Sequence, residues 1–228
     1  MKVESPEPRV ESQNTSSLAV LISGGLDSAI LLGDALRRQV IIYPIYVRCG
    51  LHWEATELDN LHRFLAALRQ PNLRPLIVLE EPVADIYGAH WSVTGIGIPD
   101  AESADHAVFL PGRNVMLLAK SLLWCHLNRV PALALGSLQT NPFPDATPEF
   151  FRSMQVVVNQ AMQGNVEVRL PFAGLGKTAV MRLGKGLPLE HTFSCIAPAN
   201  SRHCGRCNKC AERKKAFADA GMPDPTEY

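Results

Sequence analysis

A short apolar run that leads into a double-glycine turn constrains the fold of this chain most strongly. Residues 18–22 read LAVLI, and residues 23–28 follow directly as SGGLDS. An uninterrupted apolar run of this length is typical of a strand that is buried on both faces of a parallel sheet. Residues 29–38 then carry apolar side chains at helical spacing. The core is therefore expected to begin with a buried strand, a tight turn and a helix.

The same alternation of strand and helix continues along the chain. Further strands are expected at residues 40–47 (in spite of Pro44), 76–79, 132–135 and 166–170, and further helices at residues 54–68, 114–128 and from Pro148 onward. This order predicts an α/β fold with a doubly wound, mostly parallel sheet of about five strands. Residues 18–185 are expected to form this domain, and residues 186–228 a C-terminal helical lobe.

The six residues of the turn are suited to hold phosphate. Gly24 and Gly25 let the backbone turn tightly and bring its N–H groups close to an anion. The helix N-terminus adds partial positive charge, and Ser23 and Ser28 offer hydroxyl donors. Asp27 would repel a phosphate, so we expect Mg²⁺ between the two. The competing interpretation is an ordinary strand-to-helix turn in which Asp27 or Ser28 caps the helix.

The hexapeptide resembles the PP-loop of the ATP pyrophosphatases and lacks the Gly-Lys-Ser/Thr ending of the common nucleotide triphosphatases. The resemblance implies that ATP is cleaved between its α and β phosphates and that AMP is transferred to a substrate oxygen. It implies catalytic roles for Asp27, Ser28 and Lys177, although Lys177 could also be an ordinary surface lysine. The nucleotide-binding residues that it implies are Leu21, Ile22, Ser23, Gly24, Gly25, Leu26, Asp27 and Ser28.

Four of the six cysteines gather late in the sequence, at Cys195, Cys204, Cys207 and Cys210. The two-residue gaps bend the backbone so that sulfurs face one ion, and four sulfurs complete the tetrahedron that Zn²⁺ prefers. Such a closed ligand set predicts one structural zinc ion per chain. An iron–sulfur cluster is the alternative. The neighbouring His203 could replace a cysteine, but four thiols make this unnecessary.

Together, the turn and the cysteines resemble the 7-cyano-7-deazaguanine synthase family, which makes the nitrile precursor of queuosine. The resemblance extends over most of residues 18–220, and the tail at residues 194–217 is its most specific part. Supporting stretches lie at residues 109–114 (FLPGRN), 143–145 (FPD), 149–150 (EF) and 170–172 (LPF), together with Lys177. It implies that the carboxylate of a 7-carboxy-7-deazaguanine is adenylated by ATP and converted with ammonia, through an amide, into a nitrile, with release of AMP and pyrophosphate.

Four residues in the supporting stretches are candidates for contacting the deazapurine. Arg113 could clamp a carboxylate, and Asn114 could contact a base edge or cap the following helix. Asp145 could accept hydrogen bonds from a guanine-like edge or could be a turn residue. Phe143 could stack on the base or pack as a half-exposed aromatic. The family also implies a homodimer.

Several positions depart from the family pattern. Leu26 stands where many members have Gln, Ala146 and Thr147 stand where they have Cys and Arg, and Ala179 replaces an acidic residue. A second hypothesis is therefore a divergent paralogue that stops at the amide or passes the activated deazapurine to another amine, such as a protein acceptor. A third is a protein that binds or modifies tRNA through a basic cluster formed by Arg202, Arg206, Lys209, Arg213, Lys214 and Lys215.

Composition limits the partners of the chain. The 22 Lys and Arg residues balance 22 Asp and Glu residues, and this zero net charge makes nucleic-acid binding an unfavoured expectation. No window approaches the ~18 uninterrupted apolar residues of a membrane-spanning helix, so we expect no membrane partner. Residues 1–17 are rich in Ser, Glu and Pro without an apolar signal core, which predicts a disordered leader and a cytoplasmic location.

Overall fold

The computed structural model describes residues 17–38 and 41–228. Five parallel strands form one sheet in the order β3-β2-β1-β4-β5. The strands are β1 (Ser17–Leu21), β2 (Ile41–Arg48), β3 (Ile77–Glu80), β4 (Ala132–Ala134) and β5 (Glu167–Arg169). The prediction of a doubly wound α/β fold with a parallel sheet of about five strands is confirmed.

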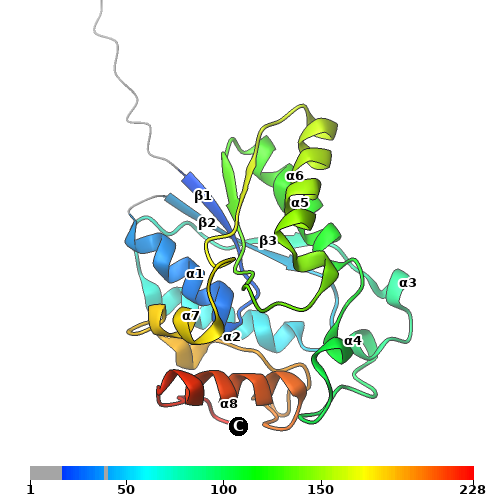
Figure 1. The fold of residues 1–228 in the computed structure, drawn as a ribbon, viewed down its shortest axis with the longest axis vertical. Coiled ribbons are helices and arrows are strands. Elements are labelled where there is room, and N and C mark those ends of the chain that lie inside the picture. Colours follow the sequence, from blue (N-terminus) through cyan, green and yellow to red (C-terminus); the bar gives the residue numbers. More distant parts are fainter. Residues whose placement is uncertain (1–16, 39–40) are drawn as a thin grey trace, which may run out of the picture.

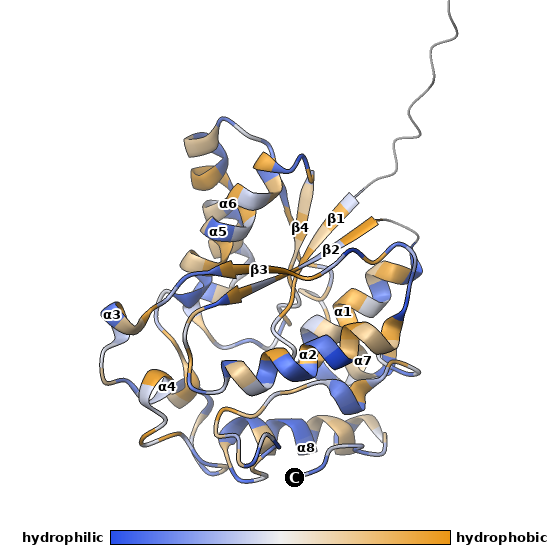
Figure 2. Cartoon of the chain, turned by 180° about the vertical axis from the view of Figure 1, so that it is seen from behind, coloured by the Kyte–Doolittle hydropathy of each residue, from blue (hydrophilic) through white to orange (hydrophobic). Residues whose placement is uncertain are grey.

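Helices cover both faces of this sheet (Figure 1). The helices are α1 (Leu26–Arg37), α2 (Glu54–Leu68), α3 (Ala84–Tyr87), α4 (Trp91–Thr94), α5 (Arg113–Leu127), α6 (Pro148–Met162), α7 (Lys177–Leu183) and α8 (Asn208–Ala220). Helices α5 and α6 lie on one face, and α1, α2 and α7 lie on the other, with α8 beyond them. Hydrophobic residues run along β1, β2 and β3, whereas much of α8 is hydrophilic (Figure 2).

The strand order reverses at β1. The chain moves from β1 to β2 and β3 on one side, and then returns to place β4 on the other side of β1. In open α/β sheets, ligands bind beyond the carboxyl ends of the strands at such a reversal. The SGGLDS turn follows the carboxyl end of β1, so the topology puts this turn at the favoured position for a binding site.

Pro44 lies within β2, as the sequence predicted, and the strand accommodates it by a change of register. Ile42 forms a bridge with Leu73, whereas Ile45 pairs with Ile77, so the β3 side contains one extra residue across this step. Because proline has no backbone N–H, it is tolerated where regular pairing is interrupted. On the other side, Pro44 pairs in register with Val20 of β1.

The C-terminal segment packs closely onto the sheet domain. Leu189, Ala216 and Phe217 belong to the same buried cluster as α1 and α7, and Cys195, Cys207 and Cys210 belong to the buried cluster of α5 and α6. The domain boundary at residues 185 and 186 stays a prediction. Of the predicted leader, only Ser17 lies in the described residues, where it begins β1. Across residues 17–38 and 41–228, no helix combines the length and the apolar character that crossing a membrane requires.

Candidate active site and metal centre

The SGGLDS turn is held in a narrow space between α2 and the segment that follows β4. Gly24 has a φ of +78°, and a Cβ atom there would lie 3.1 Å from Cγ of Glu57 in α2. On the other side, a Cβ atom on Gly136, just after β4, would lie 3.1 Å from the carbonyl carbon of Asp27. Both glycines therefore let neighbouring backbone approach the turn closely.

The N-terminus of α1 is open toward this turn. Its N-cap is Gly25, and no side chain in the described part of the chain caps it. Ser28 Oγ instead donates to the carbonyl of Gly25 at 3.2 Å and accepts from the N–H of Ser23 at 3.2 Å. The expected capping of α1 by Asp27 or Ser28 is therefore wrong, and the helix N-terminus can accept an anionic ligand.

Lys177, at the start of α7, lies beside the turn and is not an ordinary surface lysine. Its Nζ is 2.9 Å from both carboxylate oxygens of Asp27 and 3.7 Å from Glu212 of α8. Glu212 also accepts a 2.6 Å bond from Lys209. Burial raises the pKa of Glu212, but Lys209 and Lys177 together hold that pKa below its usual value. Lys177 thus supplies positive charge next to Asp27, where the sequence predicted Mg²⁺.

Three cavities meet at Asp27. The first, of about 230 Å³, extends from the turn to the ends of β1 and β2 and is lined by Leu21, Ile22, Tyr46, Arg113 and Asn114, among others. The second, of about 500 Å³, lies between the loop after β4 and α8 and includes Phe143 and Lys177. The third, of about 190 Å³, lies over the turn itself. All the predicted nucleotide-binding and catalytic residues except Gly24 line one of these cavities.

Arg113 and Asn114 begin α5 next to the turn. Arg113 lines the first and third cavities, and its buried Nε has no hydrogen-bond partner among the described residues. A buried guanidinium donor without a partner is costly unless a ligand completes it. Asn114 does not cap α5, because its side chain donates to the carbonyl of Asp145 at 2.8 Å. The N-cap of α5 is Gly112.

Asp145 and Phe143 have structural contacts of their own. Asp145 is buried, and its Oδ2 accepts a 3.2 Å bond from the backbone N–H of Asn114, so this carboxylate holds the first turn of α5. Phe143 stacks on Phe109, with ring centroids 5.1 Å apart. Their predicted contacts with a substrate stay predictions.

The sequence interpretation missed Glu57 and its partner Tyr46. Glu57 is buried on the wall of the third cavity, and its Oε2 accepts a 2.7 Å bond from the Tyr46 hydroxyl. Burial raises the pKa of Glu57 to about 8. Glu54, one turn earlier, is also buried and accepts 2.6 Å bonds from the N–H groups of Cys49 and Gly50. The sequence offered one indication of this site, which was the pair of acids three residues apart at the start of the helix that follows the second strand.

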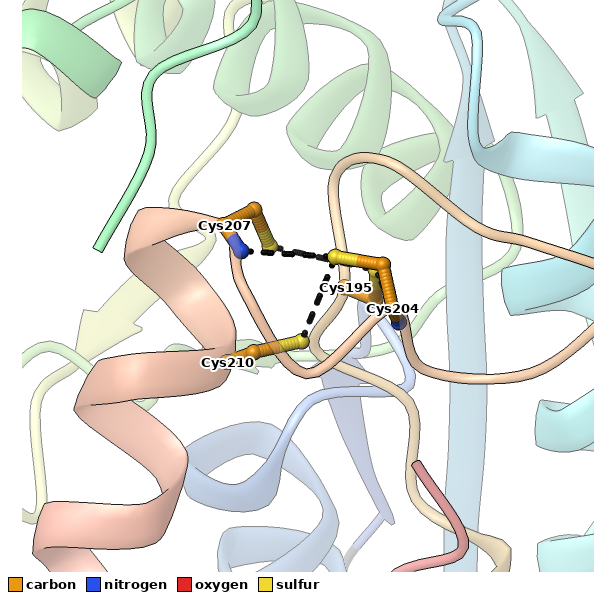
Figure 3. Close-up of side chains that lie close together, drawn as sticks. All are labelled: Cys195, Cys204, Cys207 and Cys210. Carbon is orange, nitrogen blue, oxygen red and sulfur yellow. Dashed lines mark hydrogen bonds between the residues drawn. The ribbon is translucent and has the colours of Figure 1, made fainter.

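The four predicted cysteine ligands come together in space. Figure 3 shows their side chains pointing toward one another from the loops that precede α8 and from its first turn. The four sulfurs lie within 4.8 Å of one another, with Sγ–Sγ distances of 3.8 Å for Cys195–Cys207 and 4.0 Å for Cys204–Cys210. Backbone N–H groups of Ala197 and residue 204 donate to Cys195 Sγ, each at 3.3 Å. The cluster can therefore hold a metal ion.

His203 and several residues of the basic cluster form contacts within the protein. His203 Nε2 accepts a 3.1 Å bond from the N–H of Ser194, and the ring is not part of the sulfur group. Arg213 is buried and donates to Thr192, Leu189 and Thr226, so it does not belong to a solvated basic face. Lys209, Lys215 and Arg202 each form an ion pair with an acid. Three of the six basic residues are thus paired with acids.

A parallel α/β sheet with the double-glycine SGGLDS turn at its point of reversal defines a protein of the PP-loop class. The comparisons with known proteins narrow this class further. The family model described as "Queuosine biosynthesis protein QueC" matches residues 17–221, and the chain belongs to this family.

Relatives of known name agree with this placement. The chain is 33% identical over 224 residues to the 7-cyano-7-deazaguanine synthase of Xanthomonas campestris, which covers 92% of this chain and 96% of the relative. It is 34% identical, with the same coverage, to the protein of that name from Xanthomonas oryzae. Among solved structures, the U34-tRNA thiolase NcsA of Methanococcus maripaludis is similar with a TM-score of 0.50 and 12% identity, covering 91% of this chain and 68% of the thiolase. This last similarity concerns the fold alone.

Proposed function

We propose that this protein is an ATP-dependent synthase that converts 7-carboxy-7-deazaguanine and ammonia into 7-cyano-7-deazaguanine. The carboxylate attacks the α-phosphate of ATP, which gives an acyl adenylate and pyrophosphate. Ammonia displaces AMP to form the amide. A second ATP activates the amide oxygen, and loss of AMP leaves the nitrile. Each adenylation turns an oxygen that departs poorly into one that departs as AMP.

One observation carries this proposal: the Asp27–Lys177 pair at the open N-terminus of α1, where three cavities meet. The N–H groups of the turn and the Ser23 and Ser28 hydroxyls are the groups proposed to bind the phosphate chain. Lys177 is placed to stabilise the negative charge that develops on departing pyrophosphate, and preorganised charge of this kind is a large contribution to catalysis. Mg²⁺ between Asp27 and the phosphates stays part of the proposal, because a carboxylate oxygen is a ligand that Mg²⁺ prefers.

Arg113 is the residue proposed to hold the substrate carboxylate. Its unpartnered Nε and its presence on the walls of both the first and the third cavity support this role. A guanidinium binds a carboxylate through two parallel hydrogen bonds, which also fixes its orientation. Asn114 and Phe143 line the adjoining cavities and are proposed to contact the deazapurine ring. Asp145 has a second carboxylate oxygen with which it can accept from that ring.

The sulfur geometry supports zinc at the metal centre. A Zn–S bond of about 2.3 Å in a regular tetrahedron requires sulfur atoms about 3.8 Å apart. Cys195–Cys207 and Cys204–Cys210 lie 3.8 and 4.0 Å apart. In a four-iron cluster each cysteine binds a different iron, which would spread the sulfurs further. Cys195, Cys204, Cys207 and Cys210 are therefore proposed to hold one zinc ion. When bound, this ion stabilises the fold without an open coordination position.

Analysis of the products by mass spectrometry tests the proposed reaction. Purified protein with its metal is incubated with ATP, ammonia and 7-carboxy-7-deazaguanine. The nitrile, AMP and pyrophosphate are expected. Accumulation of the amide as sole product would instead establish the divergent paralogue, a hypothesis motivated by Ala146 and Thr147. A homodimer in the cytoplasm is the expected setting, and sedimentation velocity checks the dimer.

A further inference from the structure

Glu57 is a buried acid to which the reaction proposed above gives no role. It lies on the wall of the 190 Å³ cavity over the SGGLDS turn, together with Gly25, Ser28 and Lys177. The Glu57 side chain also backs the turn directly, since its Cγ is the atom that a Cβ on Gly24 would approach to 3.1 Å. A cavity of this size beside an uncapped helix N-terminus fits a pyrophosphate group.

The charges around this cavity favour an anion, with Glu57 as the exception. Asp27 and Glu212 line the same cavity, but each is paired with a lysine. Glu57 forms no ion pair within the described ranges, and its one hydrogen bond comes from the Tyr46 hydroxyl to Oε2. An ionised carboxylate facing a pyrophosphate would repel it, and an unpaired buried charge is unfavourable in itself.

We propose that Glu57 serves as a neutral carboxyl group that donates a hydrogen bond to a phosphate oxygen of pyrophosphate. Tyr46 occupies Oε2, which leaves Oε1 to carry the proton and face the cavity. Glu57 is then a binding residue for the leaving group of the reaction. The inference rests on the proposed function, because it requires that this cavity receive the β and γ phosphates of ATP.

The electrostatic surroundings of Glu57 support a neutral carboxyl at neutral pH. Burial raises its pKa to about 8, against smaller opposing effects of the Tyr46 hydrogen bond and of Arg113, while Glu54 raises it further. The other charged groups that line the cavity come from four helices: Asp27 of α1, Arg113 of α5, Lys177 of α7, and Lys209, Glu212 and Arg213 of α8. A bound anion favours protonation of Glu57 still more, so binding and protonation should reinforce each other.

The test is calorimetric titration of inorganic pyrophosphate into the full-length, metal-containing protein at pH 7 and pH 9. Wild type is compared with Glu57→Gln, because the glutamine amide donates a hydrogen bond at every pH and cannot ionise. Asp59→Asn, at an exposed acid two residues further along α2, is the matched control. At each pH, the wild-type dissociation constant is divided by that of Glu57→Gln. This ratio cancels the effect of the change in protonation of pyrophosphate itself, because both proteins bind the same ligand.

This ratio is expected to rise about tenfold from pH 7 to pH 9. Asp59→Asn should keep the wild-type pH dependence. If Glu57→Gln does not fold, Tyr46→Phe gives an independent result: loss of the hydrogen bond that stabilises the ionised carboxylate should move the fall in affinity to higher pH. A ratio that stays flat, or a Tyr46→Phe profile that does not move, overturns the inference while the synthase proposal stands. Failure of the wild type to bind pyrophosphate or ATP at any pH overturns both.

Discussion

The beginnings of α1 and α8 show two ways to use a helix N-terminus. Both follow a loop that contains glycine, and neither has a side chain from the described residues as a cap. At α8, the loop N–H groups are occupied by sulfur, since those of Arg206 and residue 207 donate to Cys204 Sγ. At α1, the turn opens into three cavities. The N-terminus of α8, which is closed by sulfur, suits a permanently bound ion. The N-terminus of α1, which is open to the cavities, suits a ligand that must leave.

Helix α8 connects these two regions. Its first turns carry Cys210, which lies in the sulfur cluster, and Glu212, whose carboxylate reaches Lys177 in the active site. Arg213, one residue further, is buried and ties α8 to the loop at Leu189 and Thr192. The cysteine cluster and a wall of the candidate active site therefore both include residues of α8, although none of the four cysteines lines the three cavities.

The largest effect is expected from removing one cysteine of the sulfur cluster at the start of α8. Cys210→Ser should reduce the zinc content from one ion per chain to near zero, because a hydroxyl is a poor zinc ligand. The loss of stability should be on the order of 10 kcal/mol, enough to unfold the C-terminal segment. Metal analysis and thermal unfolding measure both effects. Cys125→Ala, at a buried cysteine outside the cluster, is the control and should keep the zinc. A full complement of zinc in Cys210→Ser would contradict the ligand assignment.

The second-largest effect is expected at the open turn that precedes α1. Lys177→Met should lower the rate of adenylation by about 10²–10³-fold, because the positive charge beside Asp27 and the departing pyrophosphate is lost. The zinc content and the melting temperature should change little. The rate is measured as exchange of labelled pyrophosphate into ATP. Lys185→Met, at an exposed lysine nearby, should retain the wild-type rate. Equal rates in the two variants would remove Lys177 from the mechanism.

The pH dependence of stability gives a smaller effect per pH unit. The pKa of Glu57 is raised from 4.5 to about 8 in the folded protein. Its stabilising contribution is therefore complete below pH 4.5 and is lost as pH rises through 8. Between pH 5 and 8 the free energy of unfolding of wild type should fall relative to Glu57→Gln by up to about 1.4 kcal/mol per pH unit. Urea denaturation at several pH values checks this, and parallel curves for the two proteins would show that Glu57 is ionised throughout.

The smallest predicted effect tests whether Asp145 contributes to the stability of the fold or only to substrate binding. Asp145→Ala removes the acceptor of the Asn114 N–H at the start of α5, which should cost about 1 kcal/mol of unfolding free energy. Glu102→Ala, at an exposed acid, should change stability by less than about 0.5 kcal/mol. Urea denaturation compares the two. Unchanged stability in Asp145→Ala, with a raised KM for the deazapurine, would show that Asp145 acts on the substrate alone.

The sequence predicted well those elements whose conformation is determined by residues close together in the chain. The apolar strands and the cysteine gaps fix their own geometry, so the sheet and the sulfur cluster follow from short stretches of chain. Partners across the fold could not be deduced in this way. Lys177 meets Asp27 across 150 residues, and Asp145 supports Asn114 across 31 residues. Glu57 was overlooked because an acid in an amphipathic helix is usually exposed, and only the packing of α2 against the turn buries it.

The central claim is that the turn at residues 23–28 holds ATP while an acid is adenylated. The most direct measurement is exchange of labelled pyrophosphate into ATP by the metal-containing protein, with and without 7-carboxy-7-deazaguanine. The account predicts exchange that depends on the deazapurine acid and disappears when it is omitted. Absence of exchange with the acid present, in protein that is folded and carries its zinc, would contradict the account.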